Sequence, residues 1–272
     1  RVELDQTQDS DGQRQSFDPN TPPTLETIPM TYCVAIKLNR GLVFLADTRT
    51  NAGVDNVSRV RKLFTWQQPG DRVIAMMTAG NLGITQAVIS ELNEDIDRPH
   101  SNTPNILTAE SMFDVAQIVG DKMRMVQQRY AGGLSARGVD SGASIIVGGQ
   151  RAGGPPRLFL VYAAGNFIEA MEDTPYFQIG EHKYGKPIID RVISVETEIE
   201  DAVIAALLSM DSTIRSNLSV GMPLDLAVVR NDALAFEQLR RIEAEDSAYH
   251  AFSEQWSNQL KNAFGVMRQM QV

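Results

Sequence analysis

A β-hairpin pattern begins abruptly at Thr31, after a polar, proline-containing stretch. From residue 31 to residue 38 side chains alternate with the period of two that a strand requires. Asn39-Arg40-Gly41 supplies turn residues, and residues 42–47 form a second apolar run. The ordered part of the chain is therefore predicted to open with two antiparallel strands, with a threonine at the edge of the first.

The later apolar patterns group strands together instead of alternating them singly with helices. Further strands are predicted at residues 58–66, 72–77, 143–147, 158–163, 224–229 and 234–239. Helical periodicity predicts helices after Asn81, from about 112 to 126 with Thr108 as N-cap, from 197 to 215 with a Thr197–Glu200 capping box, and over a terminal stripe from Tyr249 to Phe264. Clustered strands favour two packed sheets covered by helices over a doubly wound parallel sheet.

Composition limits the setting and the partners. The formal net charge of −9 argues against nucleic-acid binding, whose surfaces are basic. The single cysteine, Cys33, cannot form an internal disulfide, and no apolar run is long enough to cross a membrane, so a cytoplasmic location is expected. Residues 1–30 contain too few apolar residues to fold alone. They are expected to be a disordered extension (an artefact of the assigned start, a tail or a propeptide), and residues 31–272 a single domain.

Most familiar catalytic motifs are absent from the sequence. There is no GxSxG, HExxH or CxxC, and His100, His182 and His250 lack the spacing of metal ligands, so no cofactor is expected. The segment GEHKYGKP, residues 180–187, has the spacing of a phosphate-binding loop. Its eighth position is Pro187, which has no hydroxyl to hold Mg²⁺, so a turn that enters a helix is the preferred interpretation.

A threonine at the start of a chain offers a nucleophile and a base on one residue. Its α-amine has a pKa of about 7.7 to 8.0, so a neutral fraction can take the proton of the hydroxyl near neutral pH. Such a site also needs a cation, a carboxylate to hold the cation, and donors for the oxyanion. Asp47, Lys62 and the Gly80 N–H are the candidates. Taken singly, each of these residues is more simply structural, as is Thr31.

In order along the chain, these residues resemble the proteasome β-subunit family of N-terminal-nucleophile hydrolases, which includes the bacterial HslV peptidase. The resemblance is closest to the branch called Anbu, or ancestral-type β-subunits, and covers residues 31 to about 263. It is carried by MTYCVAIKL, LADTRTNAGVDN, VRKLF, TAGNLG, GEHKYGKPIIDR and SMDSTIRSNLSVGMPLDL. The resemblance implies an α+β, four-layer αββα sandwich, with Thr31 as nucleophile and base, Asp47 holding Lys62, and Gly80 serving the oxyanion.

The resemblance also implies residues around the threonine amine. Asp211 and either Ser216 or Ser219 match the acidic and hydroxyl residues found there in proteasomes. Where proteasomes carry a serine in a Gly-Ser-Gly-Ser stretch, this chain has Glu181, which is expected to take over that supporting role.

The function implied is threonine-dependent hydrolysis of peptide or amide bonds, after removal of Met30, in a homo-oligomer that forms a ring or a helical ring-like array. The aromatic stripe of the terminal helix is a candidate subunit contact. Two alternatives stay open: a catalytically weak structural or peptide-binding subunit, and an amidase of narrow specificity. The sequence assigns neither a substrate preference nor an ATPase partner.

Overall fold

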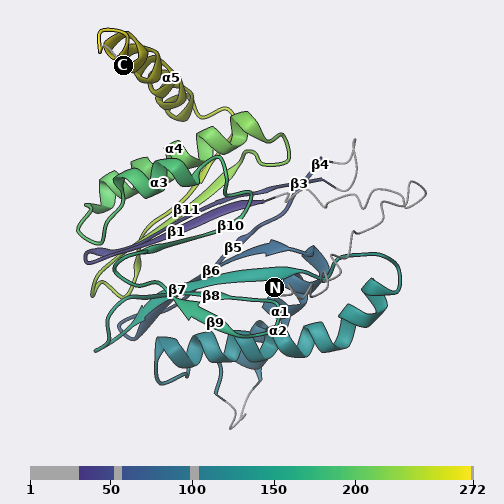
Figure 1. The fold of residues 1–272 in the computed structure, drawn as a ribbon. Coiled ribbons are helices and arrows are strands. Elements are labelled where there is room, and N and C mark those ends of the chain that lie inside the picture. Colours follow the sequence, from purple (N-terminus) through teal and green to yellow (C-terminus); the bar gives the residue numbers. More distant parts are fainter. Residues whose placement is uncertain (1–30, 52–56, 99–103, 271–272) are drawn as a thin grey trace, which may run out of the picture.

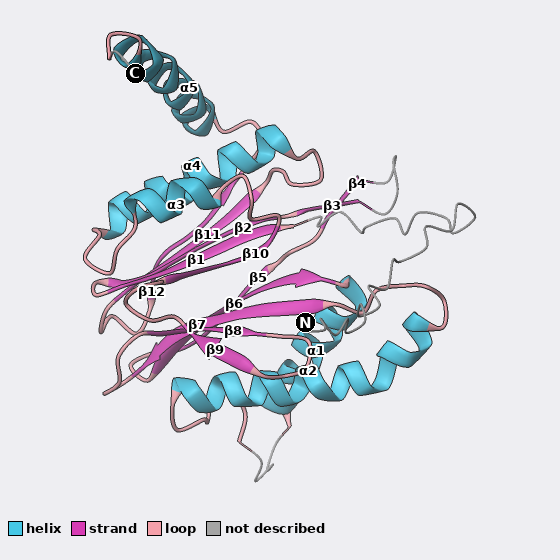
Figure 2. Cartoon of the chain, viewed as in Figure 1, coloured by secondary structure: helices cyan, strands magenta, loops and turns pink. Residues whose placement is uncertain are grey.

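The computed structural model describes residues 31–51, 57–98 and 104–270. The predicted extension, residues 1–30, and His100 lie outside the described residues. Within the described ranges the strands form two five-stranded antiparallel sheets and one two-stranded ribbon (Figure 2). None of the described helices is long and apolar enough to cross a membrane.

The first sheet contains the predicted hairpin at its centre. Its order is β10-β1-β2-β11-β12, with bounds β1 (Tyr32–Leu38), β2 (Gly41–Asp47), β10 (Tyr176–Gly180), β11 (Leu224–Arg230) and β12 (Phe236–Ile242). The second sheet has the order β5-β6-β7-β8-β9, with bounds β5 (Leu63–Gln68), β6 (Arg72–Gly80), β7 (Ala143–Arg151), β8 (Arg157–Val161) and β9 (Phe167–Glu169). The ribbon pairs β3 (Arg49–Asn51) with β4 (Val57–Arg59).

Three hydrophobic clusters hold the sheets and helices together. One lies between β6, β7 and the helices α1 (Leu82–Asp97) and α2 (Met112–Ser135). A second lies between β1, β2, β11 and the helices α3 (Lys186–Val192) and α4 (Ile199–Ser216). The third joins the two sheets through side chains of β1, β2, β6 and β7. Figure 1 shows the sheets lying against each other, with helices on their outer faces. The prediction of packed antiparallel sheets covered by helices is confirmed.

Strand β1 is buried on both faces, because helices cover one face of its sheet and the second sheet covers the other. Val34 and Ile36 pack toward α4, whereas Cys33 and Ala35 pack toward the second sheet. The alternation read from the sequence therefore separates two buried faces, not a buried face from an exposed one.

Two predicted helix starts are wrong. Helix α2 is capped by Ser111, whose hydroxyl accepts a hydrogen bond from Asp114 N at 3.1 Å, whereas Thr108 closes a turn with Asn105. Helix α4 begins after Glu198 without a side-chain cap. Thr197 forms no capping box, because its hydroxyl instead accepts from Ser194 N at 2.9 Å.

Two predicted strands also change. The single strand expected at 58–66 is interrupted between β4 and β5, so Lys62 lies in the connection and not within a strand. The last hairpin returns later than expected, because Asp232 and Leu234 both have positive φ angles and lengthen the turn before β12. The terminal helix α5 (Ser247–Met267) follows this hairpin, and it extends away from the end of α4 (Figure 1).

Candidate active site

Thr31 is placed directly before β1 and held by the end of β10. Its carbonyl oxygen accepts a hydrogen bond from Glu181 N at 2.6 Å. Gly180 packs so closely that a Cβ there would lie 1.9 Å from the same oxygen, and its φ of 81° is in the left-handed region that favours glycine. Thr31 is 7% exposed. Backbone contacts with Gly180 and Glu181 therefore hold Thr31 in place without the help of its side chain.

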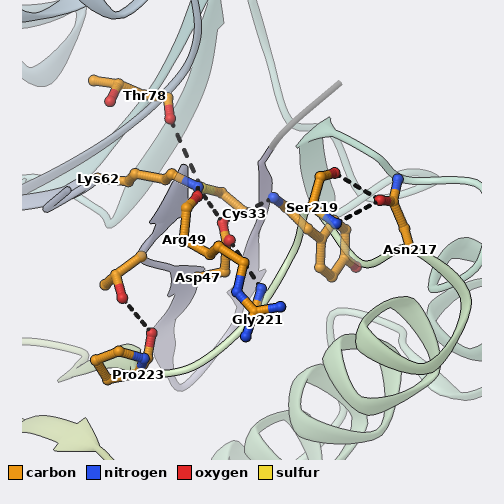
Figure 3. A network of polar contacts seen from close by, with 11 residues as sticks. Cys33, Asp47, Arg49, Lys62, Thr78, Asn217, Ser219, Gly221 and Pro223 are labelled. Atoms are coloured by element: carbon orange, nitrogen blue, oxygen red, sulfur yellow. Dashed lines mark hydrogen bonds and ion pairs between the residues drawn. The ribbon is translucent and has the colours of Figure 1, made fainter. Parts of the chain in front are cut away.

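Asp47, at the end of β2, accepts hydrogen bonds from three donors, two of which belong to the residues labelled Lys62 and Gly221 in Figure 3. Its Oδ1 accepts from Lys62 Nζ at 2.6 Å and from Tyr32 N at 3.0 Å, and its Oδ2 accepts from Gly221 N at 3.2 Å. Lys62 Nζ also donates to Arg49 O at 2.6 Å. The expected Asp47–Lys62 pair is therefore formed in the structure. The backbone N–H of Tyr32, the residue that follows Thr31, donates to the same carboxylate oxygen.

Burial shapes the electrostatics of this pair. Asp47 has no exposed surface, and burial raises the pKa of its carboxyl group, while the Lys62 ammonium and the Tyr32 and Gly221 N–H groups oppose that rise. Burial also raises the pKa of the Cys33 thiol far above its usual range. Cys33 lies two residues from Thr31 and faces Thr78 O at 3.9 Å, so it is a packing residue and not a competing thiolate nucleophile.

A cleft of about 690 Å³ opens beside Thr31. Its lining includes Thr31, Lys62, Gly80 and Gly180, together with Thr50, Thr78, Asn81, Thr85, residues 138–140 and 142 before β7, and Ala143 and Ser144 at the start of β7. Gly80 ends β6 with a φ of 98°, directly before the α1 N-cap Asn81, and a Cβ at Gly80 would lie 2.3 Å from Gly142 O. The cleft brings together Thr31, Lys62 and Gly80, which come from widely separated segments of the chain.

The residues expected around the threonine amine divide into two groups. Glu181 is buried, and its Oε2 accepts from Asn217 Nδ2 at 3.2 Å. Ser219 is also buried, and its hydroxyl donates to Asn217 Oδ1 at 2.6 Å, whereas Ser216 is exposed at the end of α4. Of the two serines left open by the sequence, Ser219 is the one in this network. Asn217, which joins Glu181 to Ser219, was missed by the sequence analysis.

Asp211 is placed elsewhere, which corrects its expected role. Its Oδ1 accepts from Ser253 Oγ at 2.6 Å and its Oδ2 accepts from Arg215 Nε at 3.1 Å. Ser253 belongs to α5, so Asp211 fastens the terminal helix to α4 and does not line the cleft at Thr31. The helical period explains the difference, since residue 211 lies on a different side of α4 from Ser209, which bonds to Tyr32.

The remaining candidate motif is a turn that enters a helix, as predicted. Residues 180–185 lead from β10 into α3, and Lys186 donates to Asp190 at 2.7 Å. Within the described part of the chain, no group of three or more His, Cys, Asp or Glu side chains is arranged to hold a metal ion.

Comparison with known proteins gives consistent results. The family model described as "Proteasome subunit" matches residues 31–229. A proteasome subunit alpha from Methanosphaerula palustris is 25% identical over 213 residues, which are 78% of this chain and 81% of that protein.

Solved structures of Anbu proteins are more similar. An Anbu (Gly-1) mutant from Hyphomicrobium sp. strain MC1 is 46% identical with a TM-score of 0.82, over 89% of this chain and 100% of that chain. Anbu (ancestral beta-subunit) from Yersinia bercovieri is 45% identical with a TM-score of 0.80, over 86% and 97%. The chain in a structure described as the helical assembly of the Anbu complex from Pseudomonas aeruginosa is 45% identical with a TM-score of 0.80, over 89% of this chain and 98% of that chain. The chain therefore belongs to the proteasome subunit family, in its Anbu (ancestral β-subunit) branch.

Proposed function

We propose that this chain is an N-terminal threonine hydrolase that cleaves peptide or amide bonds once Met30 has been removed. The hydroxyl oxygen of Thr31 attacks the carbonyl carbon, and the α-amine takes the hydroxyl proton, directly or through a water. The amine then returns the proton to the leaving nitrogen as the C–N bond breaks, which leaves an ester on Thr31. Water attacks this ester, its proton passes to the Thr31 oxygen by way of the amine, and the carboxylic acid is released.

The observation that carries the proposal is the arrangement around Asp47. One carboxylate oxygen accepts both from Lys62 Nζ at 2.6 Å and from the N–H of the residue that follows Thr31 at 3.0 Å. The buried cation is thereby held in the cleft that Thr31 lines. A nearby positive charge favours the neutral amine over its protonated form and stabilises developing negative charge on the hydroxyl oxygen. Gly80 N–H is proposed as a donor to the oxyanion.

We propose further that the domain is a four-layer αββα sandwich, and that it works as a homo-oligomer. Three hydrophobic clusters between successive layers support the sandwich. A helical assembly of an Anbu complex from Pseudomonas aeruginosa supports a ring-like helical array. Enclosing the cleft in such an array would limit access to unfolded or short substrates.

The test compares two chains that differ by one residue. A chain that begins at Thr31, checked by intact mass, is expected to hydrolyse members of a panel of fluorogenic peptides and amino-acid amides. A matched chain with one added glycine before Thr31 retains the hydroxyl but has no free amine on it. Its turnover is expected to fall at least about a hundredfold, the lower end of the range for acid–base assistance.

The Thr31→Ala variant should lose the same turnover. Equal rates for the Thr31 chain and Thr31→Ala, in assembled protein, would support a structural or peptide-binding subunit instead. Turnover of amino-acid amides alone would identify a narrow amidase.

A further inference from the structure

The loop that follows α4, residues 217–221, contacts the site through several of its groups. Gly221 N donates to Asp47 Oδ2 at 3.2 Å, and Leu218 O accepts from Arg49 Nη1 at 2.9 Å. At the other end of the loop, Asn217 contacts Glu181, the residue whose N–H holds the carbonyl of Thr31. This loop, labelled at Asn217, Ser219 and Gly221 in Figure 3, therefore connects both supports of the threonine.

The hydrogen bonds of Asn217 fix which way its amide points. Its Oδ1 accepts from the backbone N–H of Ser219 at 2.9 Å, and a backbone N–H can only donate. The amide oxygen must therefore face Ser219, which places Nδ2 toward Glu181 Oε2 at 3.2 Å. A flipped amide would set two donors against each other at Ser219.

This orientation decides the role of both neighbours. The Ser219 hydroxyl has one hydrogen, and it is donated to Asn217 Oδ1 at 2.6 Å. Toward any other group the Ser219 oxygen therefore acts as an acceptor. Glu181 Oε2 likewise accepts a hydrogen bond from Asn217 Nδ2. A protonated or neutral α-amine is a hydrogen-bond donor, so two held acceptors suit an amine at Thr31.

We propose that Asn217 is a positioning residue for the Thr31 α-amine: it orients the Ser219 hydroxyl and the Glu181 carboxylate as acceptors and so sets the pH range in which the amine acts as a base. The proposal rests on the proposed threonine hydrolase function. Asn217 does this as a neutral amide, without adding charge.

The other charged groups around Thr31 come from several segments, and one of them, Asp140 before β7, lines the cleft. Asp47 ends β2 and is paired with Lys62, which precedes β5, while Arg49 on β3 reaches the 217–221 loop. After β10, Glu181 is buried and His182 is exposed, with its Nδ1 3.2 Å from Gly180 O. The charged groups of α4 nearest this loop, Asp211 and Arg215, are bonded to each other and to Ser253 of α5. Among these carboxylates, Glu181 is the one that accepts a hydrogen bond from Asn217.

The test is the Asn217→Asp variant in chains that begin at Thr31. It keeps the shape of the side chain, adds a negative charge and removes the donor to Glu181. Both changes favour the protonated amine, so we expect the pH at which the amine is half protonated to rise by about one unit. The rate of acetylation of the Thr31 amine by acetic anhydride, followed against pH by mass spectrometry of the N-terminal peptide, measures this without requiring activity. The acidic limb of kcat/KM should move by the same amount, which lowers the rate at pH 7 about tenfold.

Two further variants make the result specific. Glu181→Gln keeps an acceptor for Asn217 but removes the negative charge, so it should move the amine titration in the opposite direction, to lower pH. Asn39→Asp is the matched control, because the Asn39 Nδ2 donates to Glu196 at 2.7 Å in an exposed turn at the far end of β1. It creates the same pair of carboxylates away from Thr31 and should leave both profiles unchanged.

The outcomes separate this proposal from the function on which it rests. Amine titrations of Asn217→Asp or Glu181→Gln that overlay the Asn39→Asp control, in folded protein, would overturn the positioning role. If Asn217→Asp does not fold, Glu181→Gln carries the decision by the same criterion. If the amine titrations of the two variants are shifted but the wild-type chain shows no turnover, the positioning role is supported and the hydrolase function is not.

Discussion

Lys62 and Asp47 form an ion pair that is closed off from solvent, with side-chain exposures of 6% and 0%. Replacing Lys62 with methionine leaves the Asp47 carboxylate buried beside only two backbone donors. Removing one partner of a buried pair costs about 3–5 kcal/mol of the free energy of unfolding. We therefore expect Lys62→Met to lose stability by about this amount in urea unfolding, and to lose turnover.

Lys186→Met is the matched control for that change. Lys186 and Asp190 are 2.7 Å apart on one face of α3, but both side chains are nearly half exposed. Exposed pairs at this spacing contribute about 0.5 kcal/mol or less. Equal losses of stability in the two variants would show that the Lys62–Asp47 pair is not the buried support described above.

At the residue scale, the sequence could predict the groups whose order along the chain is distinctive. Thr31, Asp47, Lys62 and Gly80 belong to that set, and the structure gathers all four around one cleft or its immediate support. Asn217 was not predictable in this way, because its role depends on a contact with Glu181 that only folding creates. The family resemblance implied that Asp211 lies near the threonine amine, whereas helix geometry turns it toward α5.

Among the elements, β10 packs directly against Thr31 through Gly180. Gly180 ends this strand with a φ of 81°, and its missing side chain leaves room for the Thr31 carbonyl. In Gly180→Ala the new Cβ would lie 1.9 Å from that oxygen, so β10 or Thr31 must move. A displacement near 1 Å can cost about a hundredfold in rate, which is the loss of kcat/KM we expect.

Gly153→Ala separates backbone strain from this contact. Gly153 has a similar φ of 77°, but nothing lies within 4 Å of its Cβ position. It should cost about 1 kcal/mol in stability and leave turnover unchanged. Comparable rates for the two alanine variants would contradict the claim that β10 positions the threonine.

Element boundaries were less predictable than element types. Ser111 and Thr108 are both good N-caps by residue type, and the choice depends on the turn that Thr108 makes with Asn105. The short strand β9 carries little pattern of its own, and it pairs with β8. The long helices and the strands β1, β2, β6, β7, β8 and β11 were predictable because they bury periodic apolar faces.

In the molecule as a whole, α5 is little covered by the described chain, because Ser253 is its one buried residue. Its first half meets α4 through Tyr249 and Ser253, while Phe264 in its second half is 70% exposed. If α5 is a subunit contact, Phe264→Glu should shift the assembly toward smaller species in analytical ultracentrifugation without changing the circular dichroism spectrum. Burying a charge in place of an aromatic ring is unfavourable at an interface.

Met171→Glu provides the comparison for this prediction. Met171 is 66% exposed and lies just after β9, away from α5. It should leave the size distribution unchanged. Identical distributions for wild type, Phe264→Glu and Met171→Glu would remove α5 from the proposed assembly contacts.

The role of Thr31 as the nucleophile of an assembled hydrolase can be tested by mass spectrometry of the assembled chain that begins at Thr31, after treatment with a peptidyl β-lactone. Attack by the Thr31 oxygen opens the lactone ring, so we expect an ester on the peptide that begins at Thr31, with a mass increase equal to the whole lactone. We expect no adduct on Thr31→Ala. An unmodified Thr31 peptide in assembled protein, or an adduct confined to another residue, would show that Thr31 is not the nucleophile.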